Sequence, residues 1–417
     1  MMADVRPLRG VRFDARHTGP IGSLIAPPYD VAAEPANDAS FSIRKIESVD
    51  LGCAGDDHAL AARRYQEWRG QGVLRQDTAP MVYVHQHRFR RDGTSVTRTG
   101  LLARVRLVDW SDRIVLPHER TTRGPREERL ARLRAVKANL SPLYFLYRDD
   151  DGKIRDLIAD YTESAQSLEA QDEMGGAHRL TPVADTALHE RLSASFAHRT
   201  LFVADGHHRY EAALAYRDEC RISHGYDAEA PWEFVLALLA AAEDPGVIVR
   251  PTHRILIDAG NWSPRLVLQL FHRWFEVVPA DLAAPLSDSR LICRVVFAED
   301  QGAWDVHARA GDPYQALMPS GRSAAWRSLG VAAVEAIIES LFGVGAQTGE
   351  RRLLPAIDQA DAASQVKEGR TLAAFLLPEP SLDRLLAVAE EGDLLPAKST
   401  WFEPKAPAGL VINDLRA

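Results

Sequence analysis

The chain has 417 residues, of which 46% are hydrophobic and 26% are charged, close to the average of folded globular proteins. This length allows a large core and about two or three domains, and the composition excludes global disorder. Its 50 lysines and arginines against 58 aspartates and glutamates give a formal net charge of −8. That balance argues against a protein that coats nucleic acid, because such a protein needs a concentrated basic surface.

The sequence contains no candidate membrane segment, since its longest apolar run, 234–242, is far too short to span a bilayer. Its first residues lack the charged-then-apolar pattern of a secretory signal. The three cysteines are isolated and form no Cys-x-x-Cys pair, so neither a disulfide framework nor a structural zinc site is indicated. We therefore expect a cytoplasmic protein with neither a membrane nor a nucleic-acid partner.

Apolar periodicity and turn residues predict a mixture of helices and strands along the chain. Helices are expected at 59–70, 125–137, 209–219, 328–342 and 382–391. Strands are expected at 81–85, 96–108, 201–204, 295–297 and 372–377, with a hairpin turn at 90–93. The alternation is too irregular for a TIM barrel or a long doubly wound sheet, so the predicted fold class is α+β, a mixed α/β arrangement.

A dense polar cluster, Leu116-Pro-His-Glu-Arg-Thr-Thr-Arg123, lies between a strand and the helix expected at 125–137. Glu119 could act there as a general base, and arginines could hold anionic oxygens. Taken alone, the cluster is more typical of a solvated loop that caps a helix, because acidic groups are favourable near a helix N-terminus.

The most informative junction is Ala204-Asp-Gly-His-His-Arg-Tyr210, where a short strand meets a helix. Gly206 permits positive φ or a close backbone approach. The N-terminus of the following helix favours an anion, and His207, His208 and Arg209 add donors around the same point. We expect a phosphate group there, with Asp205 beside it to hold magnesium or to polarise a substrate hydroxyl.

Two other interpretations of this junction stay open. The adjacent histidines could ligate a metal, although neighbouring residues project in different directions and no His-Glu-x-x-His pattern is present. Asp-Gly is also a common turn dipeptide, so the segment could be only a turn followed by a helix cap.

A third cluster near the C-terminus is rich in proline, lysine and hydroxyl groups: Pro396-Ala-Lys-Ser-Thr-Trp-Phe-Glu-Pro-Lys405. Lys398, Ser399 and Thr400 offer the groups that bind a phosphate or a carboxylate, although the segment is no Walker A motif. An exposed loop is the simpler interpretation. Weaker candidates for a pocket wall are Tyr29 and Asp30 after a Pro-Pro step, and Asn139 and Ser141.

Together and in this order, the clusters resemble the free-serine-kinase branch of the ParB/sulfiredoxin superfamily. They are still more similar to a large, mostly uncharacterised bacterial family of about this length. The resemblance is carried by Pro28-Tyr-Asp-Val31, His118-Glu-Arg-Thr121, Asp205-Gly-His-His-Arg209 and the stretch from Pro396 to Lys405. It implies a ParB/sulfiredoxin-like nucleotide-binding core with N-terminal and C-terminal elaborations.

The resemblance also implies roles for individual residues. Glu119 would be the catalytic base, and Asp205 would assist at the reacting oxygen. The nucleotide phosphates would be bound by Gly206, His207, His208 and Arg209. The substrate would be bound by Lys398, Ser399 and Thr400. His118 and Arg123, in the first polar cluster, are further candidates for substrate binding.

The predicted function is that of a small-molecule kinase that transfers a phosphoryl group from ATP or ADP, with magnesium, to the hydroxyl of a free amino acid, serine being the leading candidate. The alternatives are a ParB-like nucleotide-binding switch, a nucleotide hydrolase in which Glu119 activates water, and a scaffold without catalysis. The predicted domains are an N-terminal region at 1–114, a catalytic core at 115–255 and a C-terminal region at 256–417 that carries the Lys-Ser-Thr loop.

Overall fold

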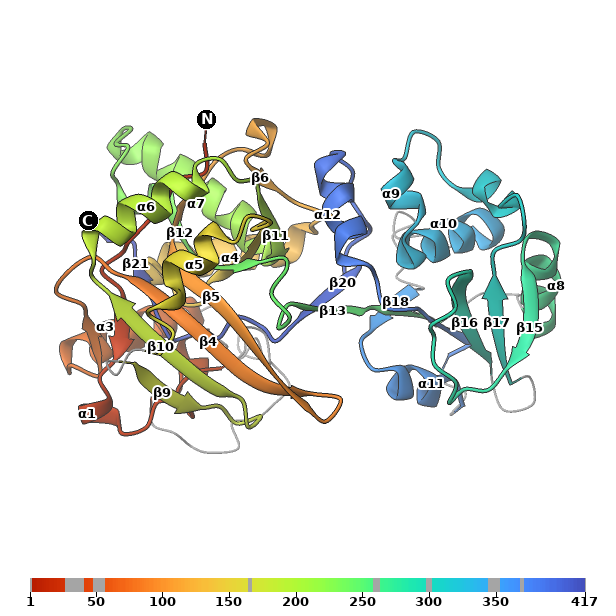
Figure 1. The fold of residues 1–417 in the computed structure, drawn as a ribbon, viewed down its shortest axis with the longest axis horizontal. Coiled ribbons are helices and arrows are strands. Elements are labelled where there is room, and N and C mark those ends of the chain that lie inside the picture. The colour runs from red at the N-terminus through yellow and green to blue at the C-terminus, as the bar shows by residue number, and fades with distance from the viewer. Residues whose placement is uncertain are drawn as a thin grey trace. The chain divides into compact units, whose positions relative to one another are not determined.

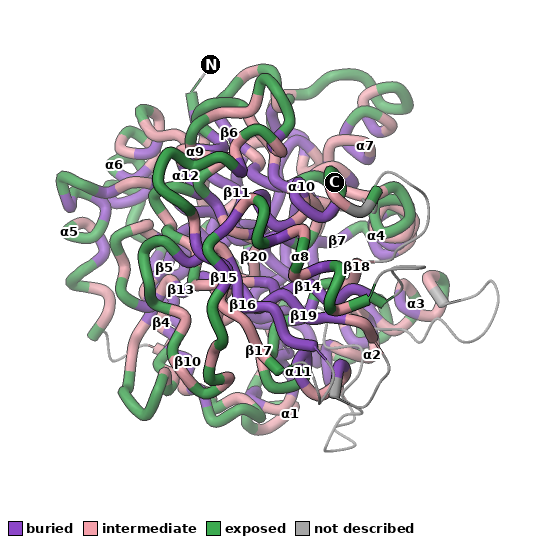
Figure 2. Tube along the Cα trace, turned by 90° about the vertical axis from the view of Figure 1, so that its right-hand side faces the viewer, coloured by how far each residue is buried: buried purple, intermediate pink, exposed green. Residues whose placement is uncertain are grey.

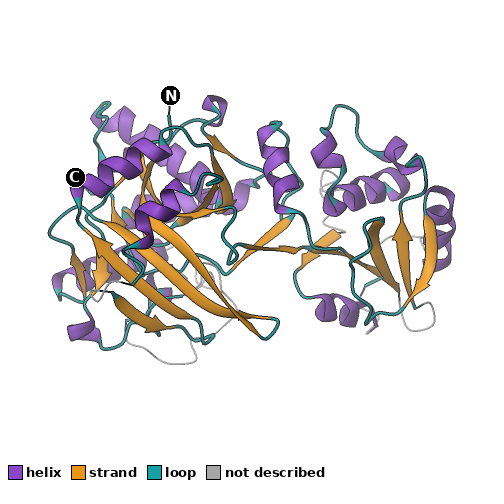
Figure 3. Ribbon diagram, in the orientation of Figure 1, coloured by secondary structure: helices purple, strands orange, loops and turns teal. Residues whose placement is uncertain are grey.

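The structure is a computed structural model that describes residues 2–26, 41–47, 57–163, 167–257, 263–297, 302–343, 353–367 and 371–416. The chain forms two compact units, drawn as ribbons in Figure 1. The first unit comprises Met1–Pro117, Thr121–Ile248 and Pro404–Ala417, and the second comprises His118–Arg120 and Val249–Glu403. Each unit combines helices with sheets (Figure 3), so the predicted α+β class is confirmed.

The first unit is built on a large mixed sheet with the strand order β6-β11-β8-β12-β5-β4-β10-β9, and β1 pairs beside β5. Its strands are β1 (Val5–Arg6), β4 (Val82–Arg91), β5 (Thr94–Arg106), β6 (Val115–Leu116), β8 (Leu143–Tyr147), β9 (Leu168–Gln171), β10 (Ala177–Val183), β11 (Leu201–Asp205) and β12 (Phe234–Ala241). Neighbouring strands are antiparallel except for β6 with β11 and β8 with β12. The apolar run near residue 234 forms the central strand β12, whose residues are buried on both faces of the sheet.

Helices pack against this sheet. The unit contains α1 (Ala15–Thr18), α2 (Arg44–Glu47), α3 (Asp57–Gly70), η1 (Trp110–Asp112), α4 (Arg123–Val136), α5 (Lys153–Ala159), α6 (Thr186–Phe196), α7 (His207–His224) and η2 (Pro231–Glu233). Leu133 of α4, Phe196 of α6 and Tyr210 of α7 belong to one core cluster with Phe145 and Leu239 of the sheet. Figure 2 colours the chain by how far each residue is buried. Short ribbons pair β2 (Val11–Phe13) with β3 (Leu74–Gln76), and β7 (Ala138–Asn139) with β21 (Asn413–Asp414).

The second unit has an antiparallel sheet with the order β15-β17-β16-β19-β14-β18. Its strands are β14 (His253–Leu256), β15 (Glu276–Ala280), β16 (Leu291–Phe297), β17 (Ala303–His307), β18 (Leu353–Ala356) and β19 (Ala373–Leu376). Its helices are α8 (Pro264–Trp274), η3 (Pro313–Leu317), α9 (Ala324–Arg327), α10 (Gly330–Phe342), α11 (Gln359–Lys367) and α12 (Leu382–Glu390). A two-stranded ribbon pairs β13 (Ile248–Pro251) with β20 (Thr400–Glu403).

The elements with the clearest sequence patterns are confirmed. The predicted helices at 59–70, 125–137, 209–219, 328–342 and 382–391 correspond to α3, α4, α7, α10 and α12. The predicted hairpin is the pair β4 and β5, in which Arg91 faces Thr94 and leaves a two-residue loop. None of the helices in the described ranges combines the length and hydrophobicity that a membrane crossing requires. The described cysteines, Cys220 and Cys293, are buried and free, whereas Cys53 lies outside the described residues.

Segments far apart in the chain contribute to the first unit. The predicted regions 1–114 and 115–255 share one sheet, because β5 pairs with β12 along its length. The last residues return to the same unit, where β21 pairs with β7 and Ile412 bridges Val11. The assignment of a catalytic domain to 115–255 and of a separate region to 256–417 stays a prediction.

The junction of β11 and α7 requires glycine. Gly206 has φ 104° and ψ 24°, a left-handed backbone conformation that an L side chain rarely adopts. A Cβ atom at this position would also lie 2.5 Å from Cδ2 of Leu143 on the neighbouring strand β8. Because Gly206 has no side chain, the chain can pass directly from the buried strand, which ends at Asp205, to the helix, which begins at His207.

Replacement of Gly206 by alanine is expected to lower the free energy of unfolding by about 2 kcal/mol or more, through backbone strain and overpacking. Chemical denaturation of the purified variant measures this change. The matched control is Gly70→Ala, since Gly70 ends α3 and a Cβ there would meet no atom within 4 Å. Equal stability of the two variants would contradict the assignment of strain to Gly206.

Candidate functional site

Asp205, at the end of β11, is the centre of an ion-pair cluster in the first unit. Its Oδ1 accepts a hydrogen bond from Nζ of Lys405 at 2.7 Å, and its Oδ2 accepts one from Nη2 of Arg209 at 2.8 Å. We call these three residues the Asp205 cluster. Burial by itself raises the pKa of the Asp205 carboxyl, but the charges of Lys405 and Arg209 outweigh it and hold the pKa well below its usual range. The carboxylate is therefore ionised at neutral pH.

Arg209 fixes the cluster to the neighbouring strand segment. Its Nη1 donates to Oγ of Ser141 at 2.9 Å and to the carbonyl oxygen of Pro142 at 2.7 Å. The guanidinium, one turn into α7, thus joins the Asp205 carboxylate to the segment that enters β8. Two cations and one carboxylate leave the cluster with a net positive charge beside the positive end of the α7 macrodipole. Such a site favours an anion.

The two histidines of the junction have different surroundings. His208 is partly buried, and its Nε2 accepts a hydrogen bond from the backbone N–H of Thr122 at 2.9 Å. This bond places the proton of the neutral ring on Nδ1. His207, the first residue of α7, is buried and its charge contributes to the low pKa of Asp205. Thr121 donates to Glu211 at 2.7 Å, so two contacts hold the start of α4 against the start of α7.

A second cluster lies in the second unit, where the His-Glu segment meets the Lys-Ser-Thr loop. The backbone N–H of Leu395 donates to the carbonyl oxygen of His118 at 2.8 Å, and the N–H of Arg120 donates to that of Leu395 at 3.1 Å. Nε2 of His118 lies 2.9 Å from the hydroxyl of Thr400, and its ring packs edge-on against Phe402. Segments that are 280 residues apart in the sequence are therefore paired here.

Glu119 is buried in this second cluster. Its Oε2 accepts a hydrogen bond from the backbone N–H of Ser399 at 3.0 Å. Burial raises the pKa of the carboxyl above its ordinary value, although the backbone and charge of Lys398 and the charge of Arg254 act in the opposite direction. We call Glu119, His118, Ser399 and Thr400 the Glu119 cluster. A buried carboxyl with a raised pKa is the form that general acid–base catalysis uses at neutral pH.

A buried arginine shapes the loop that carries Lys398. Nη1 of Arg254 donates to the carbonyl oxygen of Lys398 at 2.9 Å, and its Nε donates to Glu335 at 2.6 Å. Lys398 has a left-handed backbone with φ 59°, and the residue is exposed. The Ser399 hydroxyl donates to the carbonyl oxygen of Pro396 at 2.6 Å. Ser399 also lines a cavity of about 1050 Å³ in this unit, which is large enough for a small-molecule substrate.

The predicted site residues thus fall into two groups. Asp205, Gly206, His207, His208, Arg209 and Ser141 come together in the first unit, and His118, Glu119, Lys398, Ser399 and Thr400 come together in the second. Asn139 supports the fold, because its side-chain oxygen accepts from the N–H of Leu236 and from Asn413. Arg123 is exposed and pairs with Glu127 at 2.6 Å. Tyr29 and Asp30 lie outside the described residues.

Sequence reasoning missed the contribution of Lys405 to the Asp205 cluster. Its side chain is only 9% exposed, an unusual burial for a lysine, and its partner lies 200 residues earlier in the chain. The one available signal was its place at the end of the Pro396–Lys405 stretch that carries the family resemblance. The ion pair explains why each of the two charged side chains can lie away from solvent.

Replacement of Asp205 by alanine is expected to lower the free energy of unfolding at pH 7 by about 3–5 kcal/mol, because it leaves two buried cations without their carboxylate. The contribution of Asp205 is full above the pKa of the unfolded carboxyl, about 3.9, and is lost as the pH falls through the lower folded pKa. The stability difference between wild type and variant should therefore be constant from about pH 5 to 8 and narrow only under strong acid.

Chemical denaturation across this pH range measures the effect. The matched control is Asp156→Ala, whose carboxylate is 73% exposed and which should change stability by less than about 0.5 kcal/mol. If the stability difference between wild type and Asp205→Ala disappeared already between pH 6 and 7, the low pKa of Asp205 would be contradicted.

Comparisons with known proteins add a family and several distant structures. No curated protein sequence matches the chain. A conserved hypothetical protein from Pyrococcus furiosus is 11% identical, with a TM-score of 0.36 over 74% of this chain and 93% of the other. A free serine kinase in complex with AMP is 12% identical, with a TM-score of 0.36 over 72% and 86%. A C-terminally truncated SbnI from Staphylococcus aureus is 12% identical, with a TM-score of 0.33 over 72% and 82%.

A family model described as "Protein of unknown function (DUF1015)" matches residues 5–333. The matched region contains Glu119 and the Asp205-Gly-His-His-Arg209 segment, and it ends before the Lys398 loop. Because the match spans well over half of the chain, the protein belongs to the DUF1015 family.

Proposed function

We propose that this protein is a small-molecule kinase that transfers a phosphoryl group from ATP or ADP to the hydroxyl of a free amino acid, with serine as the first candidate. The observation that carries the proposal is the Asp205 cluster, which holds two cations at the N-terminus of the helix α7. The motif resemblance to the free-serine-kinase branch of the ParB/sulfiredoxin superfamily supports the same interpretation.

The phosphate end of the nucleotide is assigned to the start of α7. A helix N-terminus offers backbone N–H groups and a positive dipole end, both of which favour phosphate oxygens. Lys405 and Arg209 add positive charge within hydrogen-bonding distance of Asp205, and the absence of a side chain at Gly206 allows a close approach to the backbone. In this proposal Asp205 positions the two cations.

The base is assigned to Glu119. Phosphoryl transfer depends mainly on positioning and charge stabilisation, and the attacking hydroxyl still requires a proton acceptor. The raised pKa of Glu119, which results first from burial, makes it a better proton acceptor than an ordinary surface glutamate. The bond from the Ser399 amide fixes one carboxylate oxygen, so the orientation of the base is defined.

The acceptor is assigned to the surroundings of the Lys-Ser-Thr loop. The exposed Lys398 offers an ammonium group that can pair with the carboxylate of a free amino acid. The cavity beside Ser399 offers the volume for such a substrate. The hydroxyls of Ser399 and Thr400 are already engaged with Pro396 and His118, so their proposed contribution is to shape the loop.

Magnesium does not fit on Asp205 as the residue is arranged here. Both carboxylate oxygens already accept hydrogen bonds from cations at 2.7 and 2.8 Å, and these charges oppose a divalent ion. Magnesium prefers oxygen ligands in an octahedral arrangement, and one paired carboxylate beside two cations does not provide it. The proposed roles of Asp205, Lys405 and Arg209 therefore include no step through a metal.

A phosphoryl-transfer screen tests the proposed function. Purified protein is incubated with ATP or ADP and magnesium against serine, threonine and homoserine, and phosphorylated products are detected by mass spectrometry. We expect a phosphate ester of one of these amino acids. Phosphate release without an acceptor would instead identify a hydrolase, and nucleotide binding without any product would identify a nucleotide-binding switch.

The role of Glu119 is tested with Glu119→Gln, which keeps the size of the side chain and removes the base. Turnover should fall about 100-fold or more, whereas the dissociation constant for ADP should change less than about twofold. Glu67→Gln is the matched control, because Glu67 is an exposed glutamate on α3. Parallel loss of turnover and ADP binding in a folded Glu119→Gln variant would contradict the assignment of a base.

The pH dependence of kcat/KM offers a second test of Glu119. A base must be deprotonated to act, so activity should rise with pH through the pKa of Glu119. Because burial raises that pKa, the midpoint of the acidic limb should lie above the ordinary glutamate value of 4.5. A profile that stays flat down to pH 4.5 would contradict this role.

A further inference from the structure

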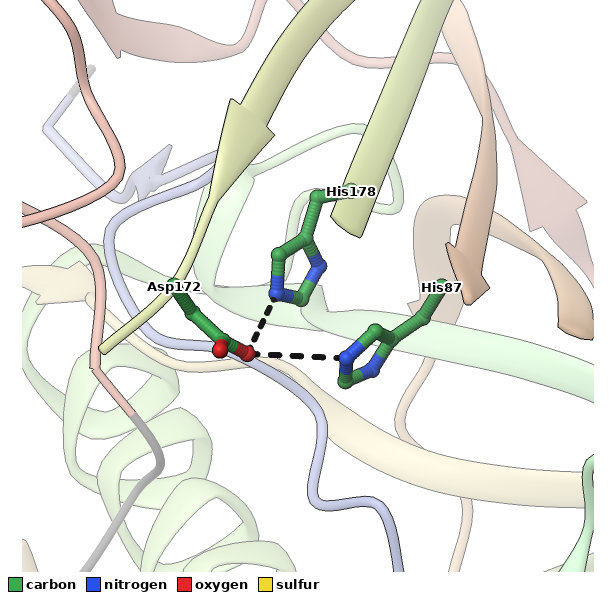
Figure 4. A group of neighbouring side chains, drawn as sticks. All are labelled: His87, Asp172 and His178. Atoms are coloured by element: carbon green, nitrogen blue, oxygen red, sulfur yellow. Dashed lines mark hydrogen bonds and ion pairs between the residues drawn. The ribbon is translucent and has the colours of Figure 1, made fainter. Parts of the chain in front are cut away.

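A group of three metal-ligating side chains lies in the first unit, apart from both clusters described above. His87 stands on β4 and His178 on β10, directly opposite each other in the register of the two antiparallel strands. Asp172 comes immediately after β9, at the start of the turn that leads into β10. Figure 4 shows the three side chains converging from these segments.

The distances between the candidate ligand atoms are those of a compact site. Oδ2 of Asp172 lies 3.0 Å from Nε2 of His178 and 3.5 Å from Nε2 of His87. One ligand atom from each of the three residues lies within 4.8 Å of the others. Ligands of a tetrahedral zinc ion, bound at 2.0–2.1 Å, are about 3.3 Å apart, so the two distances from Asp172 are close to that separation.

The turn between β9 and β10 aims the carboxylate at the histidines. Oδ1 of Asp172 accepts hydrogen bonds from the backbone N–H groups of Met174 at 2.9 Å and of Gly176 at 2.7 Å. This arrangement leaves Oδ2 directed toward the two rings. A Cβ atom on Gly176 would lie 2.5 Å from Nε2 of His87 and 2.7 Å from Oδ2 of Asp172, so glycine keeps the space between these atoms open.

His87 supplies an independent indication of a ligand. The residue is only 5% exposed, and among the described residues neither of its ring nitrogens has a hydrogen-bond partner. Its Nε2 lies 3.5 Å from the Asp172 carboxylate. Buried polar groups in folded proteins almost always have a partner, and an exception calls for an explanation. A metal ion bound by Nε2 provides one.

His85 contacts the back of the His178 ring, on the nitrogen that faces away from Asp172. It lies two residues before His87, and therefore on the same face of β4, with its Nε2 3.0 Å from Nδ1 of His178. A histidine that ligates a metal through one nitrogen usually donates the hydrogen on the other nitrogen to a nearby acceptor. If His178 binds through Nε2, the His85 ring can accept that hydrogen.

The charges around the group are compatible with a divalent cation. A histidine ligates a metal through the lone pair of a neutral ring nitrogen, and His87 offers its Nε2 beside the Asp172 carboxylate. The guanidinium of Arg98, opposite His87 on β5, opposes a cation. That charge is partly satisfied by the carbonyl oxygen of Pro404 and by the ring of Tyr144, 4.9 Å away.

The group also has a route to the surface. The side chain of Asp172 is 19% exposed. The group therefore meets solvent at its carboxylate.

We propose that His87, Asp172 and His178 form a binding site for a divalent transition metal, zinc being the best match to two imidazoles and one carboxylate. Three protein ligands leave one position of a tetrahedral ion open to water, which is the arrangement of an open site. The site stands on residues that the proposed kinase function does not use, so neither proposal depends on the other.

Zinc binding to the full chain, purified without a histidine tag, tests this site. Isothermal titration with zinc chloride at pH 7 should give one tight site per chain, and cobalt(II) at the same site should give visible absorption bands. Asp172→Asn and His87→Ala should each lower the zinc affinity at least about 100-fold, and His85→Phe should lower it about tenfold. His272→Ala, which removes an exposed histidine in the second unit, is the matched control and should leave zinc affinity unchanged.

Asp172→Asn keeps an oxygen for the N–H groups of Met174 and Gly176, so it should fold even if His87→Ala does not. Wild-type protein that binds no zinc would overturn the proposal. Zinc binding that is equally tight in wild type and in folded Asp172→Asn would also overturn it. Loss of the cobalt bands in Asp172→Asn with normal phosphoryl transfer would support a metal site separate from the kinase function.

Discussion

The buried contact of Asp205 with Lys405 and Arg209 is the interaction on which the proposed phosphate site depends. It attaches the returning C-terminal segment to the end of β11 and the start of α7. The single carboxylate requires both cations to be held beside it, and its removal would leave two charges uncompensated. The same requirement concentrates positive charge where the helix begins, so a structural constraint and an anion-binding property arise together.

The pKa of Glu119 is shifted in the opposite direction from that of Asp205. Asp205 is stabilised as an anion by nearby cations, whereas Glu119 is buried so deeply that its neutral form is favoured relative to a surface glutamate. Two carboxyl groups with pKa values shifted in opposite directions are suited to different tasks. One can organise fixed positive charge, and the other can accept a proton more readily than a surface glutamate does.

The local parts of the fold could be predicted from the sequence, and the long-range pairings could not. The sequence predicts the strand β11 from a short apolar run, the turn from Gly206 and the helix α7 from helical spacing. The contact of Glu119 with Ser399 and that of Asp205 with Lys405 join residues 280 and 200 positions apart, so no local pattern shows them. The His87, Asp172 and His178 group depends on the register of β4 and β10, which periodicity alone does not define.

The most direct test of the phosphate site is the equilibrium binding of ADP to wild-type protein and to Lys405→Met. This variant removes one cation and leaves Asp205 paired with Arg209, so the junction should stay folded. We expect wild type to bind ADP, Lys405→Met to bind it about 10- to 100-fold more weakly, and the exposed-lysine control Lys153→Met to match wild type. Equal ADP affinity of wild type and a folded Lys405→Met variant would contradict the phosphate site at Asp205.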